Sequence, residues 1–242
     1  MWMDADIVVT NSSIALDAFV DSHHHVVVAD DPFGICSGSF FVRNSCTGRQ
    51  FLRLYHAVAA GFRANEALHR VPNDALLENA AFMQALLLLE AQSRGIPWHD
   101  RRITECPLQY WQSPAKPTTT GHEVVTAMGR IHFGYDHYGF VECWEKQMRA
   151  VVGSAAKPRR SRVVLYNWAS PAGGFNSGPD FAVPNVWKPG NFLNHFAGQP
   201  NRTAKMEPYV YQLLHDRLGG SGAAHGDHHD HSHRDHGSSG RE

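Results

Sequence analysis

Several features that would assign the chain to a familiar class are missing. No apolar run reaches the roughly 18–20 residues that a helix needs to span a bilayer, so no transmembrane helix is expected. The first residues show no signal-peptide pattern, because Met1 leads directly into a pair of aspartates. Acidic and basic side chains nearly balance, at a formal net charge of −1. This balance argues against a nucleic-acid or acidic-membrane partner held by bulk charge.

Cysteine is scarce and irregularly spaced. The four cysteines allow three disulfide pairings and favour none, and their spacing does not match a zinc site. The redox compartment therefore stays open. Two glycosylation sequons, at Asn11 and Asn201, are compatible with a secretory lumen, although such triplets are common by chance.

The remaining composition is that of a globular protein with a tail. With 242 residues, 43% of them apolar, the chain can bury one sizeable core. From residue 219 onward Gly, Ser, Asp and His replace the apolar residues, and we expect a disordered tail over 219–242. The six histidines of this tail could chelate metal ions loosely, but low complexity without a selected role is the preferred interpretation.

Hydrophobic patterning predicts a mixture of strands and helices. The expected strands are at residues 2–9, 26–28, 39–42, 124–133 and 162–168, and the expected helices at 47–64, 73–94, 141–152 and 209–218. The helix at 73–94 is apolar nearly all round and should lie in the core. Residues 96–121 are rich in Pro, Thr and Gln and are predicted to form a loop, and 171–189 an irregular segment.

Two carboxylates one residue apart, Asp4 and Asp6, accompany the first expected strand. Such a pair can bind a hard divalent cation such as Mn²⁺ or Mg²⁺, whose preferred ligands are oxygen atoms. A lone Asp-x-Asp gives weak support, because a solvated turn explains most such pairs. The metal interpretation therefore depends on the rest of the chain.

Three segments in a fixed order strengthen it. They are WMDAD at residues 2–6, FGICSGSFFVRNS at 33–45 and WKPGNFLNHFAG at 187–198. Together they resemble the retaining glycosyltransferases of family 34, which groups fungal α-galactosyltransferases with plant xyloglucan xylosyltransferases. That family shows W-x-D-A-D, then N-A-G-S-F-x-x-R-N, then an acidic residue and Gln opening a helix, and finally G-D-F-x-x-H-F-A-G. The resemblance covers residues 1–93 and 183–210.

The resemblance implies an α/β, GT-A-like fold for nucleotide-diphospho-sugars. It implies transfer of a hexose or pentose, galactose or xylose, from a UDP-sugar to an oligosaccharide or polysaccharide acceptor, with retention and with Mn²⁺ (or Mg²⁺). Localisation in the Golgi lumen as a type II membrane protein is implied as well. In this fold a nucleotide-binding half of βαβ units, on the order of 100 residues, precedes the Asp pair. No such half precedes Asp4 in this sequence. We therefore expect residues 1–218 to be the C-terminal portion of a catalytic domain, with little or no sugar transfer by this portion alone and with a membrane anchor only in the missing N-terminal part.

The resemblance makes Asp4 and Asp6 ligands of a cation that bridges the two phosphates, with His195 as the third ligand. The diphosphate leaving group gains negative charge as its bond to the sugar breaks, so positive charge is needed there. His195 is one of 17 histidines, and an arbitrary histidine would more often be a core or surface residue. The flanking Phe-Ala-Gly sequence favours the ligand role.

Four further residues would contact the donor. In the family the segment around Gly38 and Ser39 lines the cleft beneath the donor sugar, although a junction between a strand and a helix would also explain it. Gly198 would let the backbone approach a phosphate. Lys205 stands where related enzymes place a basic residue against the diphosphate, and Arg202 is the alternative.

Glu78 and Asn79 occupy the position of the family's acidic-Gln pair and are the predicted catalytic residues. A carboxylate beside the anomeric carbon would stabilise positive charge on the sugar, whether or not a covalent intermediate forms. The alternative is that Glu78 is an acidic residue favoured by the helix dipole in a first turn. The chain departs from the family here, and again at Cys36 and Ser37, where the family has Asn-Ala or Asn-Thr.

Two other functions stay open. Glycogenin-like enzymes also combine an Asp-x-Asp motif with a later His and Gly, but the ending H-x-x-G-x-x-K-P-W is absent from this sequence. The second alternative is a catalytically inactive transferase remnant that acts as a glycan-binding or scaffold protein.

Overall fold

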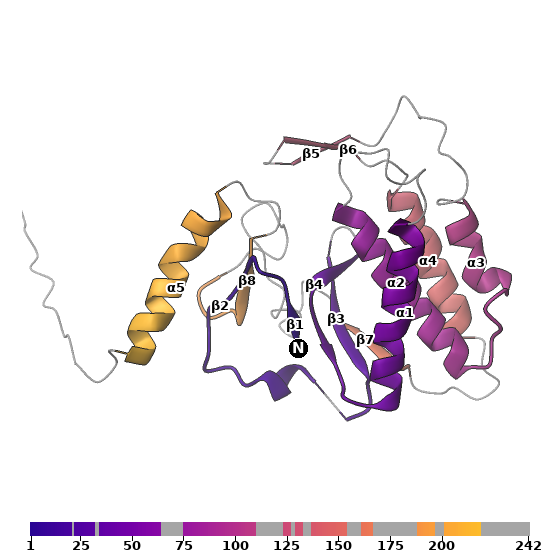
Figure 1. The fold of residues 1–242 in the computed structure, drawn as a ribbon, viewed down its shortest axis with the longest axis horizontal. Coiled ribbons are helices and arrows are strands. Elements are labelled where there is room, and N and C mark those ends of the chain that lie inside the picture. The colour runs from indigo at the N-terminus through magenta and orange to yellow at the C-terminus, as the bar shows by residue number, and fades with distance from the viewer. Residues whose placement is uncertain are drawn as a thin grey trace, which may run out of the picture.

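A computed structural model describes residues 1–20, 22–31, 34–63, 75–109, 123–126, 129–132, 137–153, 161–166, 188–196 and 201–218. The expected tail at 219–242, Gly198 and nearly all of the irregular segment at 171–189 lie outside these residues. The described part is a mixed α/β structure with three small sheets (Figure 1). The finer expectation of a GT-A-like arrangement stays a prediction.

The largest sheet has four strands in the order β1-β4-β3-β7. These are β1 (Trp2–Met3), β4 (Gly34–Val42), β3 (Val26–Asp31) and β7 (Val163–Tyr166). Strand β4 is antiparallel to both its neighbours, whereas β7 runs parallel to β3. The two smaller sheets are antiparallel pairs: β2 (Ile7–Val9) with β8 (Leu193–His195), and β5 (Glu123–Thr126) with β6 (Gly129–His132).

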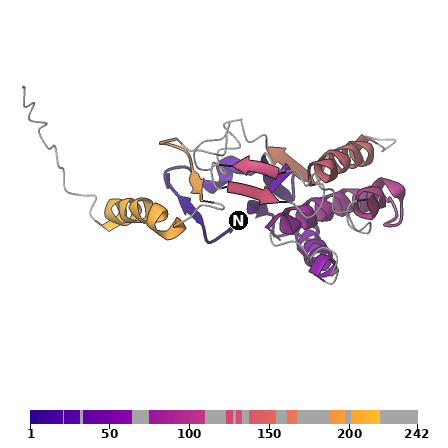
Figure 2. The same ribbon diagram turned by 90° about the horizontal axis from the view of Figure 1, so that it is seen from above.

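The helices lie on two sides of the molecule. Four of them gather beside the four-stranded sheet: α1 (Cys46–Arg63), α2 (Ala75–Ser93), α3 (Arg101–Pro107) and α4 (His137–Gly153). Helix α5 (Arg202–Leu218) stands at the other end, beyond β2 and β8, in both views (Figures 1 and 2). A short 3₁₀ helix, η1 (Leu16–Phe19), packs through Phe19 against Phe41 and Phe192. No helix in the described part of the chain is long and apolar enough to cross a membrane.

Alternation along the central strands divides the core into two clusters. In β3, Val26 and Val28 pack with the helices, whereas Val27 and Ala29 pack with β2, β8 and η1. Successive strand residues point to opposite faces, so a continuous apolar run is what a strand covered on both faces requires. The strand predicted at 26–28 is confirmed, and it continues to Asp31, beyond the expected turn.

Helix α2 is the centre of the larger cluster, as its sequence predicts. Most residues from Ala80 to Ala91 are buried, and Phe82 contacts the rings of Phe40 and Phe51 edge-on. The helix ends at Ser93, and two residues later Gly95 has a φ of 70°, in the left-handed region that glycine adopts without strain.

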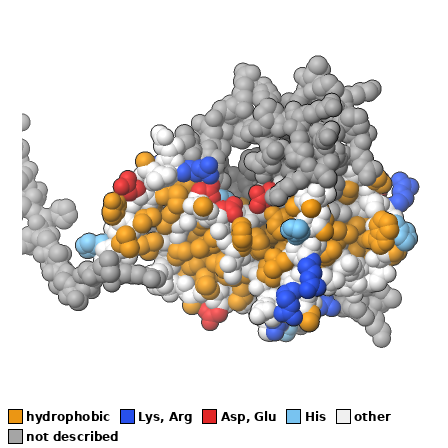
Figure 3. Space-filling model, in the orientation of Figure 1, with side chains coloured by type: hydrophobic (Ala, Val, Ile, Leu, Met, Phe, Trp, Pro, Cys, Tyr) orange, Lys and Arg blue, Asp and Glu red, His pale blue; other side chains and the backbone are white. Residues whose placement is uncertain are grey.

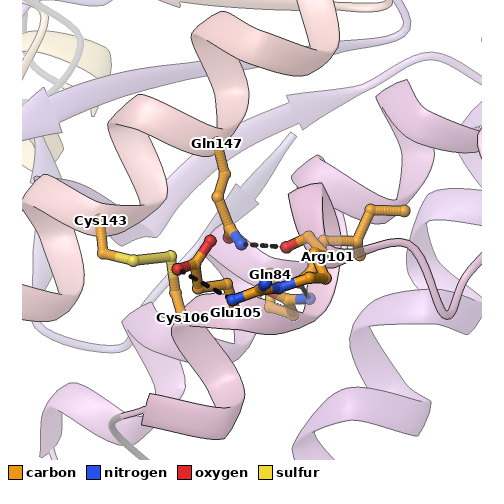
Figure 4. The surroundings of a disulfide bond; sticks show 7 residues. Gln84, Arg101, Glu105, Cys106, Cys143 and Gln147 are labelled. Atoms are coloured by element: carbon orange, nitrogen blue, oxygen red, sulfur yellow. Dashed lines mark hydrogen bonds and ion pairs between the residues drawn. A yellow bond between two sulfur atoms is a disulfide. The ribbon is translucent and has the colours of Figure 1, made fainter.

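The loop predicted over residues 96–121 is wrong in its first part, because α3 lies there. Asp100 caps α3 by accepting a hydrogen bond from the backbone N–H of Arg102, and Ile103 and Cys106 are buried one turn apart. Cys106 forms a disulfide with Cys143 of α4 (Figure 4). Beside it, the Gln147 side chain donates a hydrogen bond to the backbone carbonyl of Arg101. These contacts come from a distant helix, so the composition of 96–121 alone did not reveal them.

Three other expected elements have different bounds. The strand at 2–9 is divided into β1 and β2, and the strand at 124–133 into β5 and β6. Helix α5 begins at Arg202, before the expected start at residue 209, and contains Pro208. Proline is normally confined to the first turn of a helix, which is why the pattern suggested a later start.

Candidate metal centre

The Asp pair lies where the chain leaves one sheet and enters another. Strand β1 pairs with β4 through Met3 and Ser39, and the next residue, Asp4, donates its backbone N–H to the carbonyl of Gly38 at 2.9 Å. A turn follows, and β2 then begins at Ile7 in the sheet with β8. The chain thus changes its partner strand at the Asp pair, and this change presents both carboxylates at one place.

The register between β2 and β8 brings His195 to the same place. Ile7 pairs with His195, and the backbone N–H of Phe196 donates to the carbonyl of Asp6 at 2.8 Å. One oxygen or nitrogen atom of each of Asp4, Asp6 and His195 lies within 4.8 Å of the corresponding atom of the other two. The structure therefore brings together the three residues that the motifs proposed as metal ligands. Two carboxylates and one imidazole are a donor set that suits Mn²⁺.

The three side chains interact strongly with one another and with Arg202. Nε2 of His195 lies 3.4 Å from Oδ1 of Asp6, and Arg202 forms an ion pair with Oδ2 of Asp6 at 2.6 Å. The hydrogen bond with His195, with help from Arg202, lowers the pKa of Asp6 to about 2. Burial lowers the pKa of His195, but the hydrogen bonds with Asp6 and Cys36 outweigh burial and raise this pKa to about 10. Asp6 is thus a carboxylate at neutral pH.

Asp4 is held by Trp2. The indole Nε1 of Trp2 donates to Oδ1 of Asp4 at 2.9 Å, and the Trp2 ring stacks on Phe40 of β4 with centroids 6.1 Å apart. Burial raises the pKa of Asp4, while the bond from Trp2 opposes the shift. Trp2, the tryptophan of the first motif, therefore orients the carboxylate of Asp4.

Gly38 lies directly against the edge of the His195 ring. A Cβ atom at this position would lie 2.6 Å from Cε1 of His195 and 3.1 Å from Oδ2 of Asp4, so only glycine fits without displacement. Gly38 was predicted as a donor-binding residue, and the structure places it against two of the metal-ligand candidates. Its neighbour Ser39 is completely buried in the sheet.

Glu78 and Asn79 form a second group at the start of α2. Asn79 Oδ1 accepts hydrogen bonds from the backbone N–H of Ser37 and from its hydroxyl, and the hydroxyl of Tyr55 in α1 donates to Glu78 at 3.3 Å. Burial and the Glu78 carboxylate raise the pKa of Tyr55, and Asp4 adds to the shift. Tyr55 therefore lies within the electrostatic reach of both groups. Glu78 is exposed, in the first turn of the helix.

Lys205 and Arg202 were the two candidates for a basic residue beside the diphosphate, and the structure places only Arg202 at the Asp pair. Arg202, at the first position of α5, contacts Asp6, whereas Lys205 lies exposed further along the same helix. In Figure 3 red and blue side chains lie next to one another near the upper edge of the described surface, and other charged side chains are scattered over the same face, including a blue group at the lower right. Gly198 lies outside the described residues.

Sequence reasoning missed two contacts of the centre. Arg202 was only the second choice, and Cys36 was noted only as a departure from the family pattern. Cys36 is buried in β4, and its Sγ lies 3.6 Å from Nδ1 of His195. The two contacts span 196 and 159 residues of the chain, and no local pattern connects positions so far apart.

Comparison of the chain with protein-family models, with curated proteins and with solved structures found no match. The resemblance to the family 34 glycosyltransferases therefore rests on the three motifs, and the site must be judged on its own geometry.

Proposed function

We propose that the protein is a metal-dependent retaining glycosyltransferase that moves galactose or xylose from a UDP-sugar to a hydroxyl of a glycan. The observation that carries the proposal is the convergence of Asp4, Asp6 and His195 within 4.8 Å. These residues come from opposite ends of the described chain and were selected from the motifs alone. If the motifs had no common function, the three residues chosen from them would not be expected to converge in the structure.

The donor set fits a hard divalent cation. A bound Mn²⁺ or Mg²⁺ would supply positive charge next to the diphosphate leaving group. Asp4 and Asp6 would hold the ion through carboxylate oxygens and His195 through Nε2, the nitrogen that faces Asp6. The two carboxylates are ligands of the kind that suits Mn²⁺ and Mg²⁺, and the three proposed ligands include no thiolate of the kind that soft metals prefer.

Arg202 and Glu78 would act on the two ends of the donor. The Arg202 guanidinium already lies at the carboxylate of Asp6, so it is placed to neutralise a diphosphate bound there. Glu78 is exposed and oriented by Tyr55, and its carboxylate would stabilise positive charge on the sugar. The Cys106–Cys143 disulfide supports an oxidising compartment, which is compatible with the proposed Golgi lumen.

The test is sugar transfer from radiolabelled UDP-galactose and UDP-xylose to oligosaccharide acceptors, with Mn²⁺ and with a chelator. In a protein extended upstream by a nucleotide-binding half, we expect transfer to require the metal, and Asp6→Ala to lower the rate by about 10²–10³, the usual effect of losing one electrostatic contact to developing charge. The 242-residue chain alone should show little or no transfer. Because the histidines of 219–242 could bind metal by themselves, a protein truncated after Leu218, and therefore without the tail, serves as the control.

Three results would count against the proposal. These are metal-independent transfer, full activity of Asp6→Ala, and a wild-type protein that binds neither Mn²⁺ nor a UDP-sugar. Binding of a glycan without any transfer would favour the alternative of an inactive, glycan-binding remnant.

A further inference from the structure

We propose that Cys36 is a positioning residue of the metal centre, whose sulfur holds the His195 ring so that Nε2 faces Asp6 and the cation. This role rests on the metal-binding function proposed above. Cys36 lies in β4, and only 6% of its surface is exposed. The three-motif pattern gives this position no cysteine, so the inference comes from the geometry of this chain.

Both ring nitrogens of His195 have a neighbour. Nε2 lies 3.4 Å from Oδ1 of Asp6, whereas Nδ1, on the other side of the ring, lies 3.6 Å from Sγ of Cys36. A neutral histidine that binds a metal through one nitrogen carries its proton on the other nitrogen. The partner of that second N–H fixes the orientation of the ring and the nitrogen that is free to bind. In this site the Nδ1–H would donate to the sulfur.

The residues around His195 restrict the orientation of its ring. His195 is 8% exposed, and its Cε1 atom is so close to Gly38 that a Cβ there would lie at 2.6 Å. Cε1 lies between the two nitrogens, so the edge of the ring is pressed against β4 with one nitrogen toward each side. Independently of Cys36, Asp6 lies on the Nε2 side of the ring, and one ligand atom of each of Asp4, Asp6 and His195 lies within 4.8 Å of the other two.

A thiol suits this position for an electrostatic reason. The usual partner of a ligand histidine is a carboxylate or a backbone carbonyl. A third carboxylate would add negative charge beside Asp4 and Asp6, whereas a neutral thiol accepts the N–H more weakly and adds none. The contact would therefore contribute mainly orientation.

The experiment compares Cys36→Ala, Cys36→Ser and Cys46→Ala in the full-length protein. Mn²⁺ affinity is measured from the electron paramagnetic resonance signal of the free ion, with Asp6→Ala as the background for binding elsewhere. We expect Cys36→Ala to weaken Mn²⁺ binding about 10–100-fold, the usual effect of losing the partner of a ligand histidine. Cys36→Ser should stay within a few-fold of wild type, because its hydroxyl can accept the same proton. Cys46 is exposed at the start of α1, and its loss should change nothing.

A second measurement reports the hydrogen bond itself. In the Co²⁺-loaded protein, the Nδ1–H proton of a ligand histidine gives a strongly shifted, solvent-exchangeable proton resonance. We expect this resonance in wild type and in Cys36→Ser, and its loss or fast exchange with water in Cys36→Ala. Thermal unfolding of all variants verifies that they are folded.

The outcomes separate the two proposals. Mn²⁺ binding by Cys36→Ala that equals wild type would overturn the positioning role and leave the metal centre intact. Equal losses in the Ala and Ser variants would also overturn it, because packing of the sulfur would then be the cause. A wild-type protein without Asp6-dependent Mn²⁺ binding would remove the metal centre, and the positioning role with it.

Discussion

Gly38 is the residue at which the main chain leaves space for the side chains of His195 and Asp4. A methyl group there would collide with Cε1 of His195 and press on Asp4. We predict that Gly38→Ala weakens Mn²⁺ binding at least 10-fold by turning the ring away, and lowers the free energy of unfolding by about 1–3 kcal/mol, as overpacking usually does. Isothermal titration with Mn²⁺ and urea unfolding measure the two effects.

Gly61 provides the matched control for that substitution. It lies in α1, is exposed, and has no atom within 4 Å of the position of a Cβ. Gly61→Ala should therefore raise the free energy of unfolding by about 0.5–1 kcal/mol, the gain expected in a helix, and leave metal binding unchanged. If both alanines weakened Mn²⁺ binding equally, the collision with His195 would not be the cause.

The ion pair between Asp6 and His195 predicts how the metal-free protein responds to pH. The raised pKa of His195 stabilises the folded state fully below its ordinary value of 6.5, and this contribution is lost as the pH rises toward 10. The lowered pKa of Asp6 stabilises above 3.8, and that contribution is lost as the pH falls toward 2. In chelator, the Tm difference between wild type and His195→Gln should be largest between these ordinary values and shrink by pH 10. A difference that grows from pH 7 to pH 10 would contradict the assignment.

Among individual residues, the sequence could identify those that belong to a short motif with a known chemical role. Asp4, Asp6 and His195 each belong to a motif with a recognisable order of neighbours. Arg202 lies outside the three motifs, and Cys36 stands in the second motif at a position where the family pattern has no cysteine. The importance of both depends on contacts between segments far apart in the sequence. Tyr55 lies outside the three motifs as well, and its hydroxyl in α1 donates a hydrogen bond to Glu78.

Among the elements, α2 and β7 are joined by a buried carboxylate. Glu90 of α2 is completely buried and accepts hydrogen bonds from the Ser161 hydroxyl and from the backbone N–H groups of Arg162 and Val163. It also faces the buried Arg94 at 3.4 Å. We predict that Glu90→Gln lowers the free energy of unfolding by about 3–5 kcal/mol, because it removes one charge of a buried pair. Urea unfolding measures the loss.

A double-mutant cycle tests whether the pair is the cause. The further substitution Arg94→Met removes the second charge, so the double variant should recover part of the stability that Glu90→Gln loses. Strictly additive losses would mean that Glu90 acts only through its hydrogen bonds to the residues around β7.

The disulfide between α3 and α4 closes a loop with a sequence separation of 37 residues. For a loop of this length the chain-entropy model gives a stabilisation of about 4 kcal/mol. We predict a loss of that order for the double substitution Cys106→Ala with Cys143→Ala, measured by urea unfolding, and no further effect of a reducing agent on that variant. Cys46→Ala, at an exposed free cysteine, should leave stability unchanged.

The elements show where sequence patterns suffice and where they fail. Periodicity located α1 and α4 within a few residues, because each buries a side defined by its own apolar spacing. Helix α2 was located by its long apolar run and by the Pro and Gly residues that flank it. Helix α3 was missed because its apolar residues, Ile103 and Cys106, are too few to make a pattern. The division of residues 2–9 into two strands was missed because the choice of partner strand is made by residues far along the chain.

Across the whole molecule, burial is distributed unevenly. Helix α2 is enclosed by the sheet and other helices, whereas in α5 only Met206, Tyr209 and Leu213 are partly buried among the residues whose burial is described. Tyr209 contacts Phe196, and Arg202 contacts Asp6. We predict that amide hydrogens in α5 exchange with deuterium far faster than those in α2, because local opening is easiest where few apolar contacts must be broken. Mass-spectrometric exchange at neutral pH measures this, and equal protection of the two helices would contradict it.

The fold as a whole was predictable only to its class. A mixed α/β structure follows from alternating strand and helix patterns, and the structure agrees. The order β1-β4-β3-β7 and the separate β2–β8 pair depend on which distant segments meet, and no pattern in the sequence states that. The GT-A-like arrangement remains a prediction of the three motifs.

The pairing of β2 with β8 also has a consequence for the order in which the protein is made. Asp6 leaves the ribosome 196 residues before Arg202, its partner in the folded structure. At synthesis rates of about 5–20 residues per second, the carboxylates wait roughly 10–40 s for the segment that carries His195 and Arg202. Helices α1 to α4 and most of the central sheet emerge in that interval and have time to pack. A nascent chain would therefore assemble the cluster of Asp4, Asp6 and His195 late, and a ribosome stalled before β8 would present a packed core whose Asp pair still lacks its histidine.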